Sequence, residues 1–220
     1  MAMFVKEKKG RYITILSDGK FHESVQNGTT DAVLREYETS DGKTGSKWEL
    51  VYAKIIANIV DVRFKDGDYG EQLIIGVEGD EGTASIQVNA ESPFGESIMK
   101  LLPNVQFDKP VDFSPYAFPS DKDPDKKIRG ISFFQDGFKV ENYFYDGKEN
   151  KNDFPNPPKP RDEMTTKLWK IYFMEASEFL INYTKENICP KFSEQGMKDL
   201  HHNKALDNAL ENSDPNEIPF

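Results

Sequence analysis

The chain has 220 residues, and sixteen Phe, nine Tyr and two Trp make up much of its apolar content. Its single cysteine, Cys189, excludes an intramolecular disulfide and indicates a reducing compartment. A formal net charge of −10 excludes general attraction to polyanions, unless the basic residues gather on one face. Residues 1–9 lack the apolar core of a secretion signal, and no segment is apolar enough to span a membrane. We therefore expect a cytoplasmic protein without a membrane partner.

Residues 11–145 predict β structure. Short runs of alternating apolar and polar residues are separated by Asp-Gly pairs, which favour tight hairpin turns. One helix is predicted from Gly95 to Leu102, where Pro103 ends it. Many short strands and one small helix favour a closed or nearly closed barrel over an α/β sheet. The predicted strands cover residues 11–16, 21–26, 32–38, 47–64 (as one or two strands), 72–78, 83–88, 111–118, 128–135 and 138–145.

The proline-rich residues 154–160 predict a stiff, extended linker after the β region. Beyond it, Asp162 can cap a helix that runs to about Asn187, before Cys189-Pro190. One face of this helix is too apolar to remain in water, so we expect it to pack on the barrel or on another copy of the protein. A shorter helix is predicted over residues 194–210. The apolar face consists of Met164, Leu168, Ile171, Tyr172, Ala176, Phe179, Leu180 and Tyr183.

From Ala205 onward the chain carries four acidic residues and no basic one, and it ends in Ile218-Pro219-Phe220. The terminal ring can fill a pocket, and the free carboxylate beside it can pair with an arginine. The prolines favour an extended chain, which lowers the entropy cost of binding. This tail therefore predicts a peptide that binds a partner protein. The acidic residues are Asp207, Glu211, Asp214 and Glu217.

This ending resembles the C-terminal tip of the single-stranded DNA-binding proteins of bacteria and bacteriophages, whose acidic tail closes in Ile-Pro-Phe. In that family the tip binds helicases, nucleases, primase and polymerase subunits. The chain departs from the family in having fewer acids near the tip, with Asn216 where an acid is common. The resemblance implies that Asp214 and Glu217 form the electrostatic part of the tip, Ile218 and Pro219 its apolar flank, and Phe220 its pocket anchor.

Together the barrel pattern and the tip imply a mainly β protein, an OB-fold-like small barrel with hairpin extensions, followed by a C-terminal helical segment and an acidic tail. The expected parts are a single-stranded DNA-binding domain over residues 1–150, a linker over 151–161, a helical segment over 162–204 and a partner-binding tail over 205–220. The expected function is sequence-nonspecific binding of single-stranded DNA in replication and recombination, with the tip recruiting replication and repair enzymes.

A surface for single-stranded DNA needs basic residues along the phosphates and aromatic rings on which bases stack. Several predicted strands combine the two, and the segment from Lys139 to Tyr145 does so opposite its natural core residues Val140 and Phe144. Trp48, with Tyr52, and also Phe133 could equally belong to the core. The candidate DNA-binding residues are Lys47, Trp48, Tyr52, Lys54, Arg63, Lys65, Arg129, Phe133, Lys139, Tyr143 and Tyr145.

No glycine-rich phosphate loop, nucleophile elbow or zinc-ligand spacing occurs, so we expect no enzymatic activity, metal or cofactor. One alternative is a protein-interaction or inhibitor module whose tail mimics the tip without DNA binding, and the acidity of the chain favours it. A polysaccharide-binding module is a weaker alternative, because the chain lacks a secretion signal and disulfides. Self-association and a preference between DNA and RNA stay open.

Overall fold

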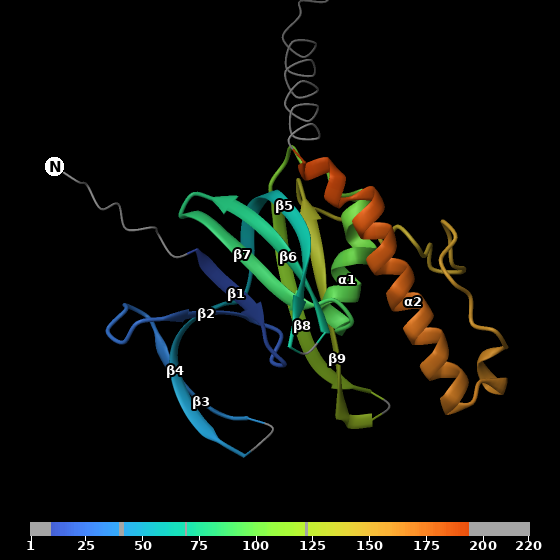
Figure 1. Ribbon diagram of the computed structural model, residues 1–220, viewed down its shortest axis with the longest axis horizontal. Helices are drawn as coiled ribbons and strands as arrows, with labels where there is room; N and C mark the ends of the chain where they lie inside the picture. The colour runs from blue at the N-terminus through green and yellow to red at the C-terminus, as the bar shows by residue number, and fades with distance from the viewer. Residues whose placement is uncertain (1–9, 40–41, 69, 122, 194–220) are drawn as a thin grey trace, which may run out of the picture.

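The computed structural model describes residues 10–39, 42–68, 70–121 and 123–193. Its ten strands form a sheet in the order β10-β9-β8-β5-β6-β7-β1-β2-β4-β3 (Figure 1). Neighbouring strands are antiparallel except β1 and β7, which are parallel, so the sheet is mixed. The strands are β1 (Arg11–Ile15), β2 (Phe21–Val25), β3 (Val33–Glu38), β4 (Thr44–Tyr52), β5 (Ile55–Gly67), β6 (Gly70–Gly79), β7 (Gly82–Asn89), β8 (Val111–Ser120), β9 (Asp123–Gln135) and β10 (Phe138–Lys139).

Strand β5 joins the two halves of the sheet. Residues 55–57 pair with β8, whereas residues 58–67 pair with β6. The register shifts between Ile59 and Asp61, and such a bulge bends a strand and increases its twist. A single strand can therefore serve both β6 and β8, and the sheet bends at this point.

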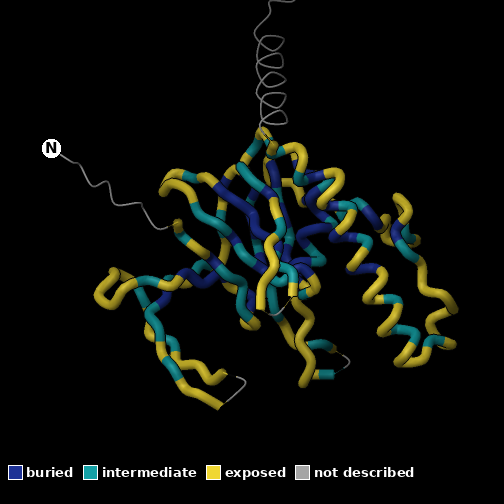
Figure 2. The backbone as a smooth tube through the Cα atoms, viewed as in Figure 1, coloured by how far each residue is buried: buried dark blue, intermediate teal, exposed yellow. Residues whose placement is uncertain are grey.

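The core lies on the inner face of β1 and β5–β9, where alternation directs the apolar residues. Helix α1 (Pro93–Leu101) connects β7 to β8, preceded by a Ser92 cap whose hydroxyl accepts a hydrogen bond from the Gly95 N–H. Figure 2 shows buried backbone concentrated in the central strands and α1, while the outer strands and hairpin tips are exposed. The fully buried side chains include Phe21, Leu73, Ile75, Ile86, Ile98, Met99, Phe113, Phe133 and Phe144.

Strands β2, β3 and β4 curve away from this core, and we call them the wing (Figure 1). At its base, the turn between β1 and β2 lies against β8. Any side chain at Gly19, whose φ is +74°, would clash with the backbone of Tyr116 and Ala117. Two independent constraints therefore require glycine at this position: the left-handed backbone conformation of the turn and the close approach of the β8 backbone.

Helix α2 (Thr166–Asn187) packs on the body through its C-terminal half, where Ala176, Leu180, Ile181 and Thr184 are buried. Its N-cap is Thr165, so the prediction of Asp162 was wrong; Asp162 lies in the preceding 3-10 turn, Arg161–Glu163. The proline-rich residues 154–160, predicted as a linker, form no helix or strand. The linker is nevertheless anchored, because Phe154 is buried between the rings of Phe144 and Phe179.

The expected mainly β fold with a C-terminal helix is confirmed, and the boundaries of most strands match the sequence pattern. No strand pairing between described residues closes the sheet into a barrel, so it is open, with β10 and β3 at its edges. The strand predicted over residues 138–145 was wrong beyond Lys139, because β10 has only two residues. The helix predicted over 194–210 lies outside the described residues. None of the described helices is long and apolar enough to cross a bilayer.

Candidate nucleic-acid interface

The side of the sheet that points away from the core is polar from β5 across to β3, and we call it the polar face. Cross-strand partners share a face, so the observed register assigns its members. For example, Lys65 on β5, Gln72 on β6 and Asn89 on β7 are successive cross-strand neighbours. The polar face comprises Asp61, Arg63, Lys65, Gln72, Ser85, Gln87, Asn89, Tyr12, Thr14, His22, Ser24, Lys47, Glu49, Arg35 and Tyr37, with Ile74 buried among them and the exposed Val33 and Val51 on the wing.

A groove of about 430 Å³ lies between the polar face and β9. Gln72, Gln87 and Asn89 line it on the side of β6 and β7, and Arg129 lines it from β9. Side-chain amides offer donors and acceptors together, which suits the mixed edges of nucleobases. Arg129 is exposed and has no ion pair with any residue in the described ranges. The groove therefore combines an available cation with a row of neutral hydrogen-bonding groups.

The outer part of the β8–β9 hairpin carries the exposed ring of Phe118 beside the half-buried ring of Tyr116. Tyr116 and Phe118 stack with ring centroids 5.6 Å apart and planes 27° apart. Phe118 is 48% exposed and Ile128, its cross-strand partner, is 45% exposed. The Tyr116 ring lies over Gly130, where any side chain would clash with its hydroxyl. This packing presents a rigid aromatic pair on the hairpin, on the side opposite Arg129, whose cross-strand partner is Ala117.

Charged side chains of the wing surround one buried carboxylate on the polar face. Glu49 is fully buried and accepts hydrogen bonds from Arg35 Nε and Lys47 Nζ, both at 2.7 Å. His22 Nδ1 lies 2.9 Å from the same carboxylate, and its Nε2 lies 3.0 Å from Asp18. Burial raises the pKa of Glu49, but the hydrogen bonds from Arg35, Lys47 and His22 outweigh it and lower the pKa to about 2. Glu49 is hidden beneath Arg35 and Lys47, so the exposed part of this cluster consists of these two cations together with the carboxylate of Asp18.

Four of the predicted DNA-binding residues lie on or beside the polar face. Lys47, Arg63 and Lys65 belong to it, and Arg129 lines the groove. Arg63 forms an ion pair with Asp61 on the same strand, which reduces its availability to phosphate. Lys65 is exposed, and no ion pair joins it to another described residue.

The other predicted residues lie elsewhere. Phe133 is fully buried with its ring edge-on to Phe113, so its prediction as a stacking platform was wrong. Trp48 and Tyr52 lie on the opposite face of β4, and the Tyr52 hydroxyl donates to Glu23 at 2.9 Å. The remaining four are removed from the groove: Lys54 is paired with Asp112, Tyr143 is half-buried against Tyr183, and Lys139 and Tyr145 are exposed on the chain that follows β9.

Sequence reasoning missed Tyr12, Arg35 and the three amides of the groove. A signal was present in residues 83–89, where Thr83, Ser85, Gln87 and Asn89 alternate with apolar residues. That alternation marks one solvent-facing side of a strand. The search for basic and aromatic neighbours passed over it, because neutral amides carry no charge and no ring.

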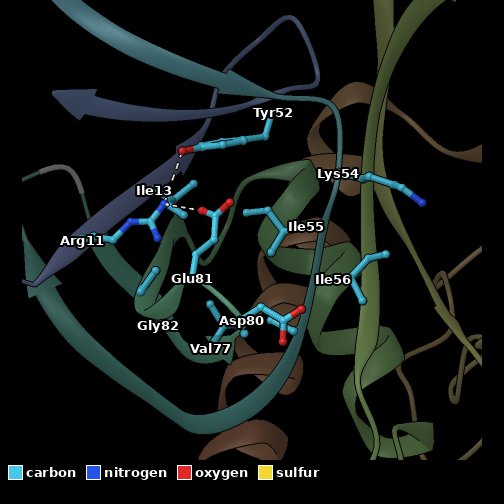
Figure 3. Close-up of a pocket in the computed structure, with 13 residues that line it drawn as sticks. Arg11, Ile13, Tyr52, Lys54, Ile55, Ile56, Val77, Asp80, Glu81 and Gly82 are labelled. Carbon is cyan, nitrogen blue, oxygen red and sulfur yellow. Dashed lines mark hydrogen bonds and ion pairs between the residues drawn. The ribbon is translucent and has the colours of Figure 1, made fainter. Parts of the chain in front are cut away.

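A second cavity, of about 260 Å³, lies among β1, the β4–β5 turn and the β6–β7 turn (Figure 3). Ile13, Ile55 and Val77 contribute apolar side chains to it. Arg11 lines it but is held by Glu23 through two hydrogen bonds of 2.8 and 2.9 Å, and it contacts Glu81 at 3.5 Å. These bonds raise the pKa of Arg11, and they lower the pKa of Glu23. Because Arg11 is paired with carboxylates, this cavity suits phosphate less well than the groove.

No protein-family model matches the chain, no curated protein matches its sequence, and no solved structure matches its fold. Within the part of the chain that the structure describes, no three His, Cys, Asp or Glu side chains gather closely enough to hold a metal ion. The predicted tip residues, Asp214, Glu217, Ile218, Pro219 and Phe220, lie outside the described residues. Function is therefore inferred from the groove and the polar face.

Proposed function

We propose that this protein binds single-stranded DNA without sequence specificity, through the polar face and the groove beside Arg129, and that its C-terminal tip recruits DNA-processing enzymes. The observation that carries the proposal is Arg129, exposed and without an ion pair among the described residues, across a groove from Gln72, Gln87 and Asn89. Arginine can bind phosphate, amides can bind base edges, and exposed rings can stack on bases.

The strand order supports an OB-fold-like reading of the central strands. An OB-fold is a five-stranded, partly open Greek-key barrel that binds oligonucleotides on its second and third strands and two of its loops. Strands β5–β9 are compatible with that plan, since β5 pairs with both β6 and β8. By this correspondence the binding elements would be β6, β7 and the β5–β6 and β8–β9 turns. Residues of β6, β7 and β9 line the groove, while β1 and the wing would be additions.

The charge of the whole chain favours a local binding track over general attraction to nucleic acid. A net charge of −10 repels DNA, so affinity must come from a few cations combined with stacking. Stacking on Tyr116 and Phe118 requires unpaired bases. We therefore expect single strands to bind much more tightly than duplex.

The test is a fluorescence titration with oligothymidine and with duplex of equal length, at low and at moderate salt. We expect salt-sensitive binding of the single strand and weak binding of the duplex. Arg129→Ala should weaken single-strand binding about tenfold, whereas Lys139→Ala, which removes another exposed cation away from the groove, should not. Absence of single-strand binding at low salt would overturn the DNA-binding proposal and favour the module that only mimics the tip.

Recruitment by the tip is tested by deleting residues 218–220. Binding to primase, helicase or exonuclease subunits should be lost, while affinity for oligothymidine stays unchanged or rises because an acidic tail competes with phosphate. Phe220→Ala should reproduce the loss, since the ring is the expected pocket anchor. Undiminished enzyme binding by both variants would show that the tip is not the recruiter.

A further inference from the structure

The N-terminal half of α2 extends beyond the body on which the helix packs and is largely unburied (Figures 1 and 2). It carries an apolar stripe. Phe173 is 55% exposed, although Leu180, two turns later on the same stripe, is fully buried. Ile171 and Met174 are 42% and 64% exposed. Between residues 168 and 174 only Lys170 is polar. Exposed apolar patches of this kind commonly mark sites where another molecule or segment binds.

Three rings on this segment form one cluster. Trp169 and Phe173, one helical turn apart, stack with centroids 5.4 Å apart and planes 19° apart. Tyr172 contacts both, with centroid distances of 5.8 Å to Trp169 and 5.5 Å to Phe173. Because these rings already pack on one another along the helix, less side-chain entropy is lost when a ligand binds them. We call Trp169, Tyr172 and Phe173 the α2 ring cluster.

Basic residues flank the α2 ring cluster. Residues 159–174 contain four basic side chains against two acidic ones, in a chain whose net charge is −10. All four basic side chains are exposed, and none forms an ion pair with a described residue. The partial positive charge of the helix N-terminus adds to theirs. The four are Lys159, Arg161, Lys167 and Lys170.

We propose that the acidic tail of the same chain, residues 205–220, docks on this surface, with Phe220 against the α2 ring cluster. The tail has the complementary chemistry, because it carries four acids, no basic residue and an apolar tip. It can also reach. The 27 residues after Ser193 span up to roughly 90 Å when extended, whereas α2, with 22 residues, is about 33 Å long.

The consequence concerns the availability of the tip, and it rests on the proposed recruiting function. A docked Phe220 is hidden from partner enzymes, so a partner must compete with the α2 ring cluster. The apparent affinity for a partner then equals the affinity of the isolated tip multiplied by the fraction of time that the tail is undocked.

The test uses the full chain carrying Trp48→Phe, so that Trp169 is the only tryptophan. Docking should shield Trp169 from acrylamide, and Phe220→Ala should raise its quenching constant about twofold. Lys167→Glu together with Lys170→Glu should have the same effect, whereas Lys148→Glu, an exposed lysine outside this surface, should not. In the reciprocal Trp169→Phe protein, Phe220→Ala should leave the quenching of Trp48 unchanged.

Equal quenching of Trp169 with and without Phe220 would overturn the proposal. Shielding that grows with protein concentration would overturn it in favour of docking on a second copy. Shielding that appears only with oligothymidine would overturn it in favour of a DNA platform. Oligothymidine titration of the same proteins keeps the two proposals separate, because tail docking needs no DNA and DNA binding needs no docked tail.

Discussion

At the scale of single residues, Glu49 shows how the wing holds cations on its surface. Its carboxylate is fully buried, yet it accepts hydrogen bonds from Arg35 and Lys47 and lies beside His22. Burying a charge is costly unless partners compensate, and here the partners outnumber the anion. The carboxylate fixes two long side chains that would otherwise move freely, and both stay partly exposed toward the polar face.

Glu49→Gln should lower the free energy of unfolding by about 3 kcal/mol near neutral pH, because it leaves three neighbouring cationic or hydrogen-bonding groups without their anion. The pKa of Glu49 is lowered from 4.5 to about 2 in the folded state. Its stabilisation is therefore complete above pH 4.5 and is lost as the pH falls toward 2. Urea unfolding across this range should show the gap between wild type and variant closing at low pH. A gap that stays constant would contradict the assignment.

At the scale of elements, α2 has two halves with different roles. The C-terminal half completes the core through Ala176, Leu180, Ile181 and Thr184, beside the rings of Phe144, Phe154 and Phe179. The N-terminal half extends past the core with the α2 ring cluster exposed. The β8–β9 hairpin is the second element that presents an aromatic ring to solvent, and it does so on the side opposite Arg129.

Leu180→Ala and Phe173→Ala compare the two halves of α2. Leu180→Ala should lower the free energy of unfolding by about 2–5 kcal/mol, since it opens a cavity in the core. Phe173→Ala removes a larger side chain but should cost less than about 1 kcal/mol, because little of the body surrounds it. Chemical denaturation measures both. A loss at Phe173 as large as that at Leu180 would mean that the N-terminal half is already packed.

Phe118→Ala tests the aromatic pair of the hairpin. It should weaken oligothymidine binding by about 1–3 kcal/mol, the usual effect of removing a ring on which a base stacks. Phe138→Ala is the matched control, because Phe138 is 78% exposed but lies on β10. Equal losses of affinity in the two variants would point to a nonspecific effect of exposed rings.

At the scale of the whole molecule, an acidic protein must confine its attraction for DNA to one track. Arg63, Lys65, Lys47 and Arg35 cross the sheet on the polar face, and Arg129 faces it over the groove. Glu49 and Asp61 neutralise part of this charge. Only a few cations are therefore free to displace counterions from the phosphates.

We expect the logarithm of the oligothymidine affinity to fall with the logarithm of the salt concentration with a slope of about −2 to −3, as for three or four phosphate contacts. Arg129→Ala and Lys65→Ala should each reduce the slope by about 0.7. Titrations over about a tenfold range of salt measure these slopes. A slope near zero would mean that phosphates contribute little and that stacking alone holds the strand.

The strands and the first helix could be predicted from the sequence, because alternation and Asp-Gly turns act over a few residues. The acidic tail and its tip are also properties of the sequence alone. The start of α2 was predicted less accurately, because the N-cap is Thr165 and not the predicted Asp162. Asp and Thr are both favoured N-cap residues, so residue type alone does not distinguish them. The aromatic segment from Tyr143 to Tyr145 looked like a strand, yet Tyr143 packs against α2 and no strand continues there.

Only the tertiary structure decided which side of each strand faces the core and which distant residues meet. Alternation separates Lys47 from Trp48 but does not say which one faces outward, since that depends on pairing with β2 and β3. Phe133 lies in the core, whereas Arg129 lines the groove, although the two are only four residues apart on the same strand. The core ends between them. Gln72, Gln87 and Arg129 meet through the pairing of β6 with β7 and the return of β9. Such contacts join residues far apart in the sequence, so no local pattern contains them.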